Sequence, residues 1–136
     1  MPKAFLDTSI LVYANDARDP IRQQRAIEVV TGHLRGKTGV VSTQVLQEYA
    51  VAAEGKLGQD PDTVLRQLAL LESLEVVLVS PPLIRRALEL HHRYRIAYWD
   101  AGILAAAEHA RCDVVLSEDL NAGQLYAAVT VRNPFA

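Results

Sequence analysis

Two acidic residues stand where apolar strands of the sequence are expected to end. Asp7 lies in "AFLDTSIL", directly after three apolar residues, and Asp119 lies in "LSEDL", just past a valine-rich run. In an open α/β sheet, ligands bind beyond the carboxyl ends of the parallel strands, so neighbouring strands would bring Asp7 and Asp119 to one edge. Asp7 can equally be the N-cap of a following helix, and its residue type alone decides neither interpretation.

Two further acids lie among apolar residues of predicted helices. Asp100 opens the alanine-rich segment "YWDAGILAAA", and its neighbours at helical spacing are apolar. Glu48 lies in "TQVLQEYAVAA", a helix that is apolar almost all round. Taken singly, each acid has an ordinary explanation. Asp100 starts a helix, Asp119 belongs to a turn or cap, and Glu48 is a partly exposed helix residue.

Taken together, the four acids predict a cation site. Carboxylates that crowd at one edge repel one another, burial adds to the cost, and no matching run of lysine or arginine accompanies them. One or two divalent cations would balance this charge. Oxygen ligands without cysteine or histidine nearby in the sequence suit Mg²⁺ or Mn²⁺ better than zinc. Such ions bind phosphate oxygens and lower the pKa of bound water, so the pattern favours hydrolysis of phosphoryl or phosphodiester bonds.

Short strands that alternate with helices are expected to position these acids. Strands are predicted at 3–7, 40–42, 75–79 and 113–117 and in "AVTVRN" near the end. Helices are predicted at 9–15, 20–34, 43–54, 62–73 and 99–110 and from the prolines after Ser80 to about 93. Thr43 is the expected cap of its helix, and Leu65, Leu68 and Leu71 are expected to face inward. The alternation predicts a three-layer α/β/α fold with a mostly parallel central sheet of about five strands, in one domain over 1–136.

The composition narrows the classes of function. The chain has 136 residues, of which 50% are hydrophobic, and a net charge of −2, which excludes a generally basic nucleic-acid coat. There is no signal-peptide run, and no stretch approaches the roughly 20 apolar residues that span a bilayer. Cys112 is the only cysteine. These features predict a cytoplasmic protein that does not enter the membrane.

The acidic segments, taken in order, resemble the PIN domain family. The matching residues are "FLDTSILVYA", Glu48 in the helix after the second strand, "YWDAGILAAA" and "LSEDLNAG", and the likeness extends from Phe5 to the closing "VRNPF". More narrowly, they resemble the VapC-type toxins of bacterial toxin–antitoxin pairs. The resemblance implies a Mg²⁺- or Mn²⁺-dependent ribonuclease with Asp7, Glu48, Asp100 and Asp119 as its acidic quartet. It also implies an RNA substrate, a small antitoxin partner and a homodimer.

The same resemblance suggests supporting residues. Thr8 and Ser9 match the hydroxyl positions after the first acid, where either could cap the helix while Asp7 faces the crevice. Ser117 matches the hydroxyl residue two positions before the last acid. Glu118 adjoins Asp119, and either carboxylate could approach the metal. The motif favours Asp119 and leaves Glu118 in a supporting or solvent-exposed position.

A basic segment and several aromatic residues have two interpretations each. "RRALELHHRYR" at 85–95 could contact RNA phosphates through Arg85, Arg86, Arg93 and Arg95, but a solvated helix face explains it as well. Trp99 could stack on a base, but a tryptophan beside an apolar helix more often lies in the core, which is the prediction here and for Tyr13 and Tyr98.

Two alternatives to a ribonuclease stay open at this point. One is a Mg²⁺-dependent phosphatase or a receiver domain with an acidic pocket, and the other is a PIN-like RNA- or protein-binding module without activity. Ser9 stands where haloacid-dehalogenase phosphatases carry a second aspartate, and no lysine ends a late strand as in receivers. The presence of all four acids speaks against an inactive module.

Overall fold

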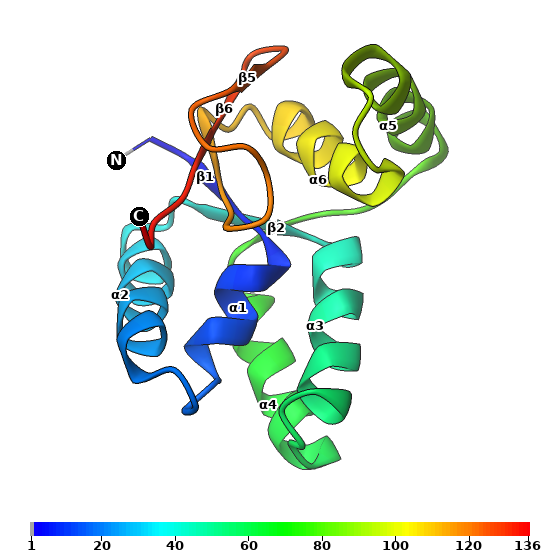
Figure 1. Ribbon diagram of the computed structural model, residues 1–136. Helices are drawn as coiled ribbons and strands as arrows, with labels where there is room; N and C mark the ends of the chain where they lie inside the picture. The colour runs from blue at the N-terminus through cyan, green and yellow to red at the C-terminus, as the bar shows by residue number, and fades with distance from the viewer. Residues whose placement is uncertain (1) are drawn as a thin grey trace.

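A six-stranded sheet forms the centre of the molecule, with strand order β3-β2-β1-β4-β6-β5 (Figure 1). The computed structural model describes residues 2–136. The strands are β1 (Ala4–Leu6), β2 (Gly39–Ser42), β3 (Glu75–Val77), β4 (Val114–Leu116), β5 (Leu125–Tyr126) and β6 (Val129–Arg132). Every neighbouring pair is parallel except β5 and β6. The predicted mostly parallel sheet is confirmed, with β5 as a strand that the sequence patterns missed.

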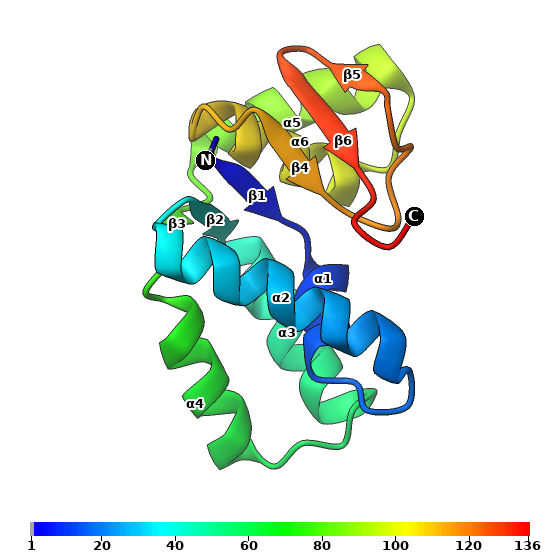
Figure 2. The ribbon, with the colours of Figure 1, turned by 90° about the vertical axis from the view of Figure 1, so that its left-hand side faces the viewer.

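Helices cover both faces of this sheet. They are α1 (Thr8–Ala14), α2 (Pro20–Gly36), α3 (Thr43–Gly55), α4 (Pro61–Leu71), α5 (Pro81–Tyr94) and α6 (Tyr98–His109). In Figure 2, α5 and α6 lie behind strands β4 and β6, and α2 lies on the viewer's side. α3 contacts α1 as well as α6, so it connects the two helical layers. Along residues 2–136, no helix has the length and apolar character that crossing a membrane requires.

The strand order reverses at β1, which places two chain segments at one crevice. β1 pairs with β2 on one side and with β4 on the other, and Leu6 is in register with Leu116. The backbone N–H of Asp7 donates to the carbonyl oxygen of Leu116 at 3.1 Å. In doubly wound sheets such a switch point is the usual ligand crevice. The segments that follow β1 and β4 therefore end side by side, as expected for Asp7 and Asp119.

The prediction that Thr43 caps α3 is wrong, and the inward face predicted for α4 is confirmed for Leu68 and Leu71 but wrong for Leu65. The cap of α3 is Ser42, whose Oγ accepts from the N–H of Val45 at 3.3 Å, while Thr43 Oγ1 accepts from the N–H of Val79. In α4 the buried face contains Val64 and Leu71, whereas Leu65 is 63% exposed. The apolar residues of α4 are numerous enough to suggest two adjacent stripes, and contact with α3 selects the one through Val64.

Candidate active site

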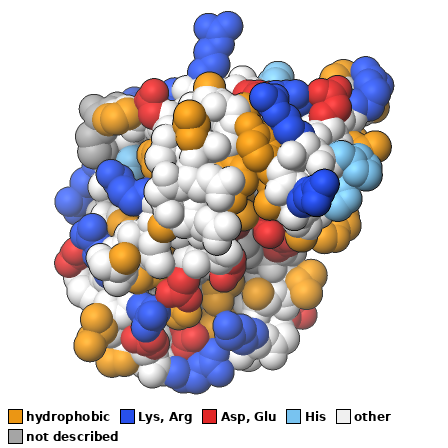
Figure 3. Space-filling view, turned by 45° about the horizontal axis from the view of Figure 1, so that its top comes forward, with side chains coloured by type: hydrophobic (Ala, Val, Ile, Leu, Met, Phe, Trp, Pro, Cys, Tyr) orange, Lys and Arg blue, Asp and Glu red, His pale blue; other side chains and the backbone are white. Residues whose placement is uncertain are grey.

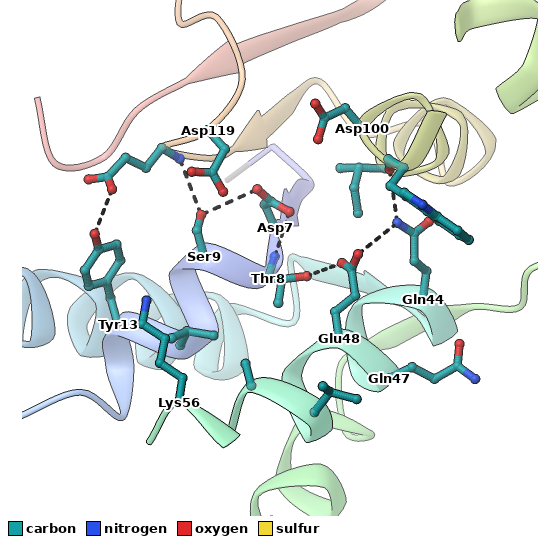
Figure 4. Close-up of a pocket in the computed structure, with 16 residues that line it drawn as sticks. Asp7, Thr8, Ser9, Tyr13, Gln44, Gln47, Glu48, Lys56, Asp100 and Asp119 are labelled. Carbon is teal, nitrogen blue, oxygen red and sulfur yellow. Dashed lines mark hydrogen bonds between the residues drawn. The ribbon is translucent and has the colours of Figure 1, made fainter. Parts of the chain in front are cut away.

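A cleft of about 700 Å³ lies at the carboxyl edge of the sheet, between α1, α3, α6 and the loop after β4. Each of these elements contributes one of the predicted acids to its lining (Figure 4). The four acids are Asp7, Glu48, Asp100 and Asp119. The fold therefore brings together carboxylates that are up to about a hundred positions apart in the sequence, as the strand-end and helix-face patterns indicated.

Asp7 is both the end of β1 and the N-cap of α1. Its Oδ1 accepts from the N–H of Thr8 at 2.7 Å, so Asp7 caps the helix, and the alternative in which Thr8 or Ser9 caps it is wrong. Its Oδ2 accepts from the hydroxyl of Ser117 at 2.6 Å. The side chain is almost inaccessible, with 8% of the residue exposed. Burial, reinforced by the charges of Asp119 and Glu48, raises the pKa of Asp7 to about 6 despite these hydrogen bonds.

Ser117 joins the first and last acids through one buried hydroxyl. Its Oγ donates to Asp7 and accepts from the backbone N–H groups of Asp119 at 3.1 Å and Leu120 at 3.3 Å. A hydroxyl can donate once and accept twice, so the hydrogen-bonding capacity of Ser117 is fully used. Through these bonds Ser117 fixes the start of the loop that carries Asp119.

Glu48 and Asp100 form the opposite side of the cleft. Glu48 Oε1 accepts from the hydroxyl of Thr8 at 2.7 Å, and Gln44 Nε2 lies 3.4 Å from Glu48 Oε2. Asp100 lies in the first turn of α6 and is half-buried. Burial raises the pKa of Asp100, and the charges of Asp119 and Glu48 raise it further. The pKa shifts of Asp7 and Asp100 show that the four acids affect one another electrostatically.

Glu118 also lines the cleft, where its carboxylate is held in a polar cluster with Tyr13 and Arg22. Its Oε1 accepts from the hydroxyl of Tyr13 and its Oε2 accepts from Arg22 Nε, both at 2.8 Å. The guanidinium of Arg22 also lies 5.7 Å from the ring centre of Tyr13 and 5.8 Å from that of Phe135. Burial opposes ionisation of Glu118, but the hydrogen bonds from Arg22 and Tyr13 outweigh it and lower its pKa. Both carboxylate oxygens of Glu118 therefore already accept hydrogen bonds from neighbouring side chains.

Of the two adjacent acids after β4, Asp119 is the one whose carboxylate is available to bind a ligand. Across residues 2–136, no hydrogen bond or ion pair involves the side-chain oxygens of Asp119, although its backbone is held by Ser117. Figure 4 shows its carboxylate on the cleft side of the loop, near Asp7. The two adjacent acids therefore differ: the carboxylate of Glu118 is hydrogen-bonded to other side chains, whereas that of Asp119 faces the cleft.

The donor set fits a hard divalent cation in chemical type. The cleft offers carboxylates and the hydroxyls of Thr8 and Ser9, and of its five lining acids only Glu118 takes part in an ion pair of the described residues. Mg²⁺ and Mn²⁺ prefer such oxygen ligands. Within 2–136, no three acidic, histidine or cysteine side chains are already gathered around one point.

The predicted RNA-contacting arginines lie outside this cleft. None of Arg85, Arg86, Arg93 and Arg95 is among its lining residues. They belong to α5 and its end, the side toward which basic and histidine side chains gather in Figure 3. Arg86 bonds to Glu108 of α6 at 2.7 Å and to Glu89 at 2.9 Å. Its contacts thus join two helices, and RNA contact by the four arginines stays a prediction.

Replacing Arg86 is expected to weaken the α5–α6 packing. Arg86→Ala leaves the partly buried Glu108 without its bidentate partner, at a cost of about 1 kcal/mol. We expect calorimetry to show a melting temperature lower by about 3 °C. Arg85→Ala, one position earlier and exposed, is the matched control and is expected to melt like the wild type. An unchanged melting temperature for Arg86→Ala together with weaker RNA binding would instead make Arg86 a substrate contact.

Several lining residues were not predicted, and one prediction about the core is wrong. Gln44 and Lys56 line the cleft, as does Trp99, which is 64% exposed. The buried side of α6 consists mainly of alanines and begins at Ala101, so Trp99 lies outside it. Tyr13 and Tyr98 do pack against the core while remaining half-exposed. The spacing of Gln44 and Glu48, one helical turn apart, was the available signal for Gln44.

The fold and the cleft define an α/β protein of the doubly wound type with a carboxylate site at its switch point. Comparison with family models makes this specific: the PIN domain model matches residues 4–127. The chain therefore belongs to the PIN domain family, as its motifs predicted. The comparison with curated proteins gave no match.

Solved structures with the same fold come from toxin–antitoxin systems. Mycobacterium tuberculosis VapC20, a sarcin–ricin loop cleaving toxin, has a TM-score of 0.71 and 19% identity over 86% of this chain and 92% of its own. A toxin–antitoxin complex from Klebsiella pneumoniae has a TM-score of 0.70 and 21% identity over 97% and 98% of the two chains. VapBC2 from Rickettsia felis, bound to a promoter DNA fragment, has a TM-score of 0.70 and 17% identity over 96% and 97%. These likenesses establish the fold.

Proposed function

We propose that this protein is a Mg²⁺- or Mn²⁺-dependent endoribonuclease that hydrolyses RNA phosphodiester bonds, acting as the VapC-type toxin of a toxin–antitoxin pair. One observation carries this proposal: four carboxylates from four elements line a single cleft at the switch point of a PIN fold. Together with the hydroxyls of Thr8 and Ser9, they offer oxygen atoms only. The similarity to VapC20, a toxin that cleaves the sarcin–ricin loop, supports the choice of substrate.

The cation would be held by Asp7, Asp100 and Asp119, with Glu48 as a further ligand. When bound, one or two ions would supply charge for the phosphate oxygens and lower the pKa of water. The chain's own residues prepare the site. Ser117 fixes the orientation of Asp7, and the hydroxyl of Thr8 fixes Glu48 Oε1. Glu48 can then orient a water molecule in the cleft or accept its proton.

An antitoxin partner and a homodimer complete the proposal. The Klebsiella structure is a toxin–antitoxin complex, and the structures from Rickettsia felis and Salmonella typhimurium are VapBC assemblies bound to DNA. By analogy, this chain would be restrained by a small partner protein. Light scattering of the isolated chain tests whether it forms a homodimer, and co-expression with a candidate antitoxin tests whether that protein restrains its activity.

The activity assay distinguishes a ribonuclease from a phosphatase. We expect the purified chain to cut an unstructured RNA oligonucleotide when Mg²⁺ or Mn²⁺ is present and to leave p-nitrophenyl phosphate intact. Fragments are separated by gel electrophoresis and phosphate release is measured by absorbance. Release of phosphate from the monoester without chain cleavage would overturn the proposal in favour of a phosphatase.

A further inference from the structure

The indole of Trp99 is an exposed aromatic surface on the wall of the acidic cleft. Trp99 directly precedes Asp100, is 64% exposed and lines the main cleft. It also lines a smaller adjoining hollow between α3, α5 and α6. Val51 is also exposed in the cleft, and Val79 and Ile84 are exposed in the hollow, but of the exposed large apolar side chains within 2–136 only Trp99 is aromatic and lines both. An exposed tryptophan leaves a large apolar area in water, and a ligand bound beside the carboxylates could cover it.

The backbone that carries Trp99 is held in place by α3. Gln44 Nε2 donates to the carbonyl oxygen of Trp99 at 3.0 Å. Gly102, one turn further along α6, makes this contact possible, because a Cβ there would lie 2.5 Å from Gln44 Oε1. The ring of Tyr98 meets the indole edge to face, with centroids 5.1 Å apart and an interplanar angle of 83°. Trp99 is thus positioned before any ligand binds, which lowers the entropic cost of binding.

The neighbourhood of Trp99 selects a ligand that has an aromatic part and a phosphate close together. The planar ring offers stacking, and Asp100 next to it belongs to the quartet that would take the phosphate through a cation. Lys56 lines the same cleft and forms no ion pair within 2–136, so it is free to meet a second phosphate along a chain. A nucleotide of an RNA strand combines these features. Both faces of a base in a duplex are covered by its neighbours, whereas an unpaired base can stack on a side chain.

We propose that Trp99 is a substrate-positioning residue on which an unpaired nucleobase stacks beside the phosphate that is cut. This inference rests on the proposed ribonuclease function and adds a requirement for unpaired RNA. Stacking on an aromatic side chain changes binding by about 5- to 150-fold per base. The contribution falls on substrate binding, because the indole touches the base and leaves the reacting atoms to the carboxylates.

The test compares Trp99→Ala and Trp99→Phe on matched RNA substrates. We expect Trp99→Ala to raise KM for a single-stranded RNA by about 5- to 150-fold with kcat nearly unchanged, and Trp99→Phe to restore most of the affinity. Leu125→Ala, which removes a comparably exposed apolar side chain elsewhere, is the control and is expected to behave like the wild type. Circular dichroism confirms that each variant is folded.

Abasic substrates locate the base that stacks. In a series of RNAs with one abasic site each, wild-type cleavage is expected to weaken most at one position next to the cut, and Trp99→Ala is expected to lose nothing further there. Since Trp99 is the only tryptophan, quenching of its fluorescence by RNA reports on the same contact. Equal KM values for wild type and Trp99→Ala, with RNA cleaved by both, would overturn the inference and leave the ribonuclease function standing.

Two other outcomes would also overturn the inference, and they are distinguishable from that one. Absence of RNA cleavage by the wild type would overturn the ribonuclease function and the stacking role together. Unchanged RNA kinetics combined with loss of a co-purifying protein partner in Trp99→Ala would assign the indole to a protein interface.

Discussion

Asp7→Asn is expected to abolish RNA cleavage and, at the same time, to stabilise the metal-free fold. Residues that merely orient metal ligands typically contribute 10- to 100-fold to activity, so loss of a ligand is expected to cost at least about 100-fold. The stabilisation arises because Asp7 is buried and its ionised form is unfavourable in the folded chain. Asparagine keeps the acceptor for the Thr8 N–H, so the helix cap survives.

The size of this stabilisation follows from the pKa of Asp7. A rise from 3.8 to about 6 corresponds to roughly 3 kcal/mol of folding free energy at pH 8. Asparagine removes the acceptor of the Ser117 hydroxyl, which costs about 1 kcal/mol. The net gain of about 2 kcal/mol raises the melting temperature by about 6 °C. Such opposite effects on activity and stability are typical of functional sites.

The stabilisation by Asp7→Asn is expected to depend on pH. Because the folded-state pKa of Asp7 is raised, the folded chain binds more protons than the unfolded chain between pH 4 and 6. The Asp7 contribution therefore destabilises the fold as pH rises through about 6, and the penalty is absent below about pH 4. We expect the melting-temperature difference between Asp7→Asn and the wild type, measured in chelator, to be largest near pH 8 and to shrink toward pH 4. A melting-temperature difference that is constant over this range would contradict a raised pKa for Asp7.

Asp119→Asn and Glu118→Gln are expected to differ by at least about 30-fold in RNA cleavage. Asp119 offers its carboxylate to the cleft, and its replacement removes a ligand, which costs more than the 10- to 100-fold of an orienting residue. Glu118 is held by Arg22 and Tyr13 through its two oxygens, and glutamine can still accept from Arg22 with its one oxygen while its NH2 group donates to the Tyr13 hydroxyl. Glu118→Gln is expected to retain activity to within about threefold, because only the charge of a partly exposed pair is lost.

The comparison is made at equal protein concentration with a fluorescent RNA substrate in saturating Mg²⁺. The two substitutions are isosteric and adjacent, so each is the control for the other. Activity that survives in Asp119→Asn and disappears in Glu118→Gln would show that the loop presents the other acid to the reaction.

The positions of the acids were predictable because they follow from general properties of the chain. A valine-rich strand that ends in an acid marks the carboxyl edge of a parallel sheet, and Asp7 and Asp119 both have this pattern. Asp100 was identified by its apolar neighbours at helical spacing. The sheet order that makes their strands adjacent was an assumption, and the pairing of β1 with β4 confirms it.

The features that sequence patterns missed depend on contacts between distant segments. One example is the difference between Glu118 and Asp119. The carboxylate of Glu118 is held by Arg22, which lies 96 positions earlier in the chain. Trp99 is exposed although it lies in the first turn of an apolar helix, and its backbone contact with Gln44 joins residues 55 positions apart. Ser42 rather than Thr43 caps α3 because the helix begins at Thr43, directly after β2 ends at Ser42.

The most direct test of the metal-dependent ribonuclease is cleavage of one unstructured RNA by chelator-treated protein before and after Mg²⁺ is restored. We predict no cleavage in chelator, full cleavage after Mg²⁺ is added back, and no cleavage by Asp7→Asn in either condition. Cleavage that continues in chelator, or that Asp7→Asn performs as fast as the wild type, would contradict a cation site built on the four carboxylates.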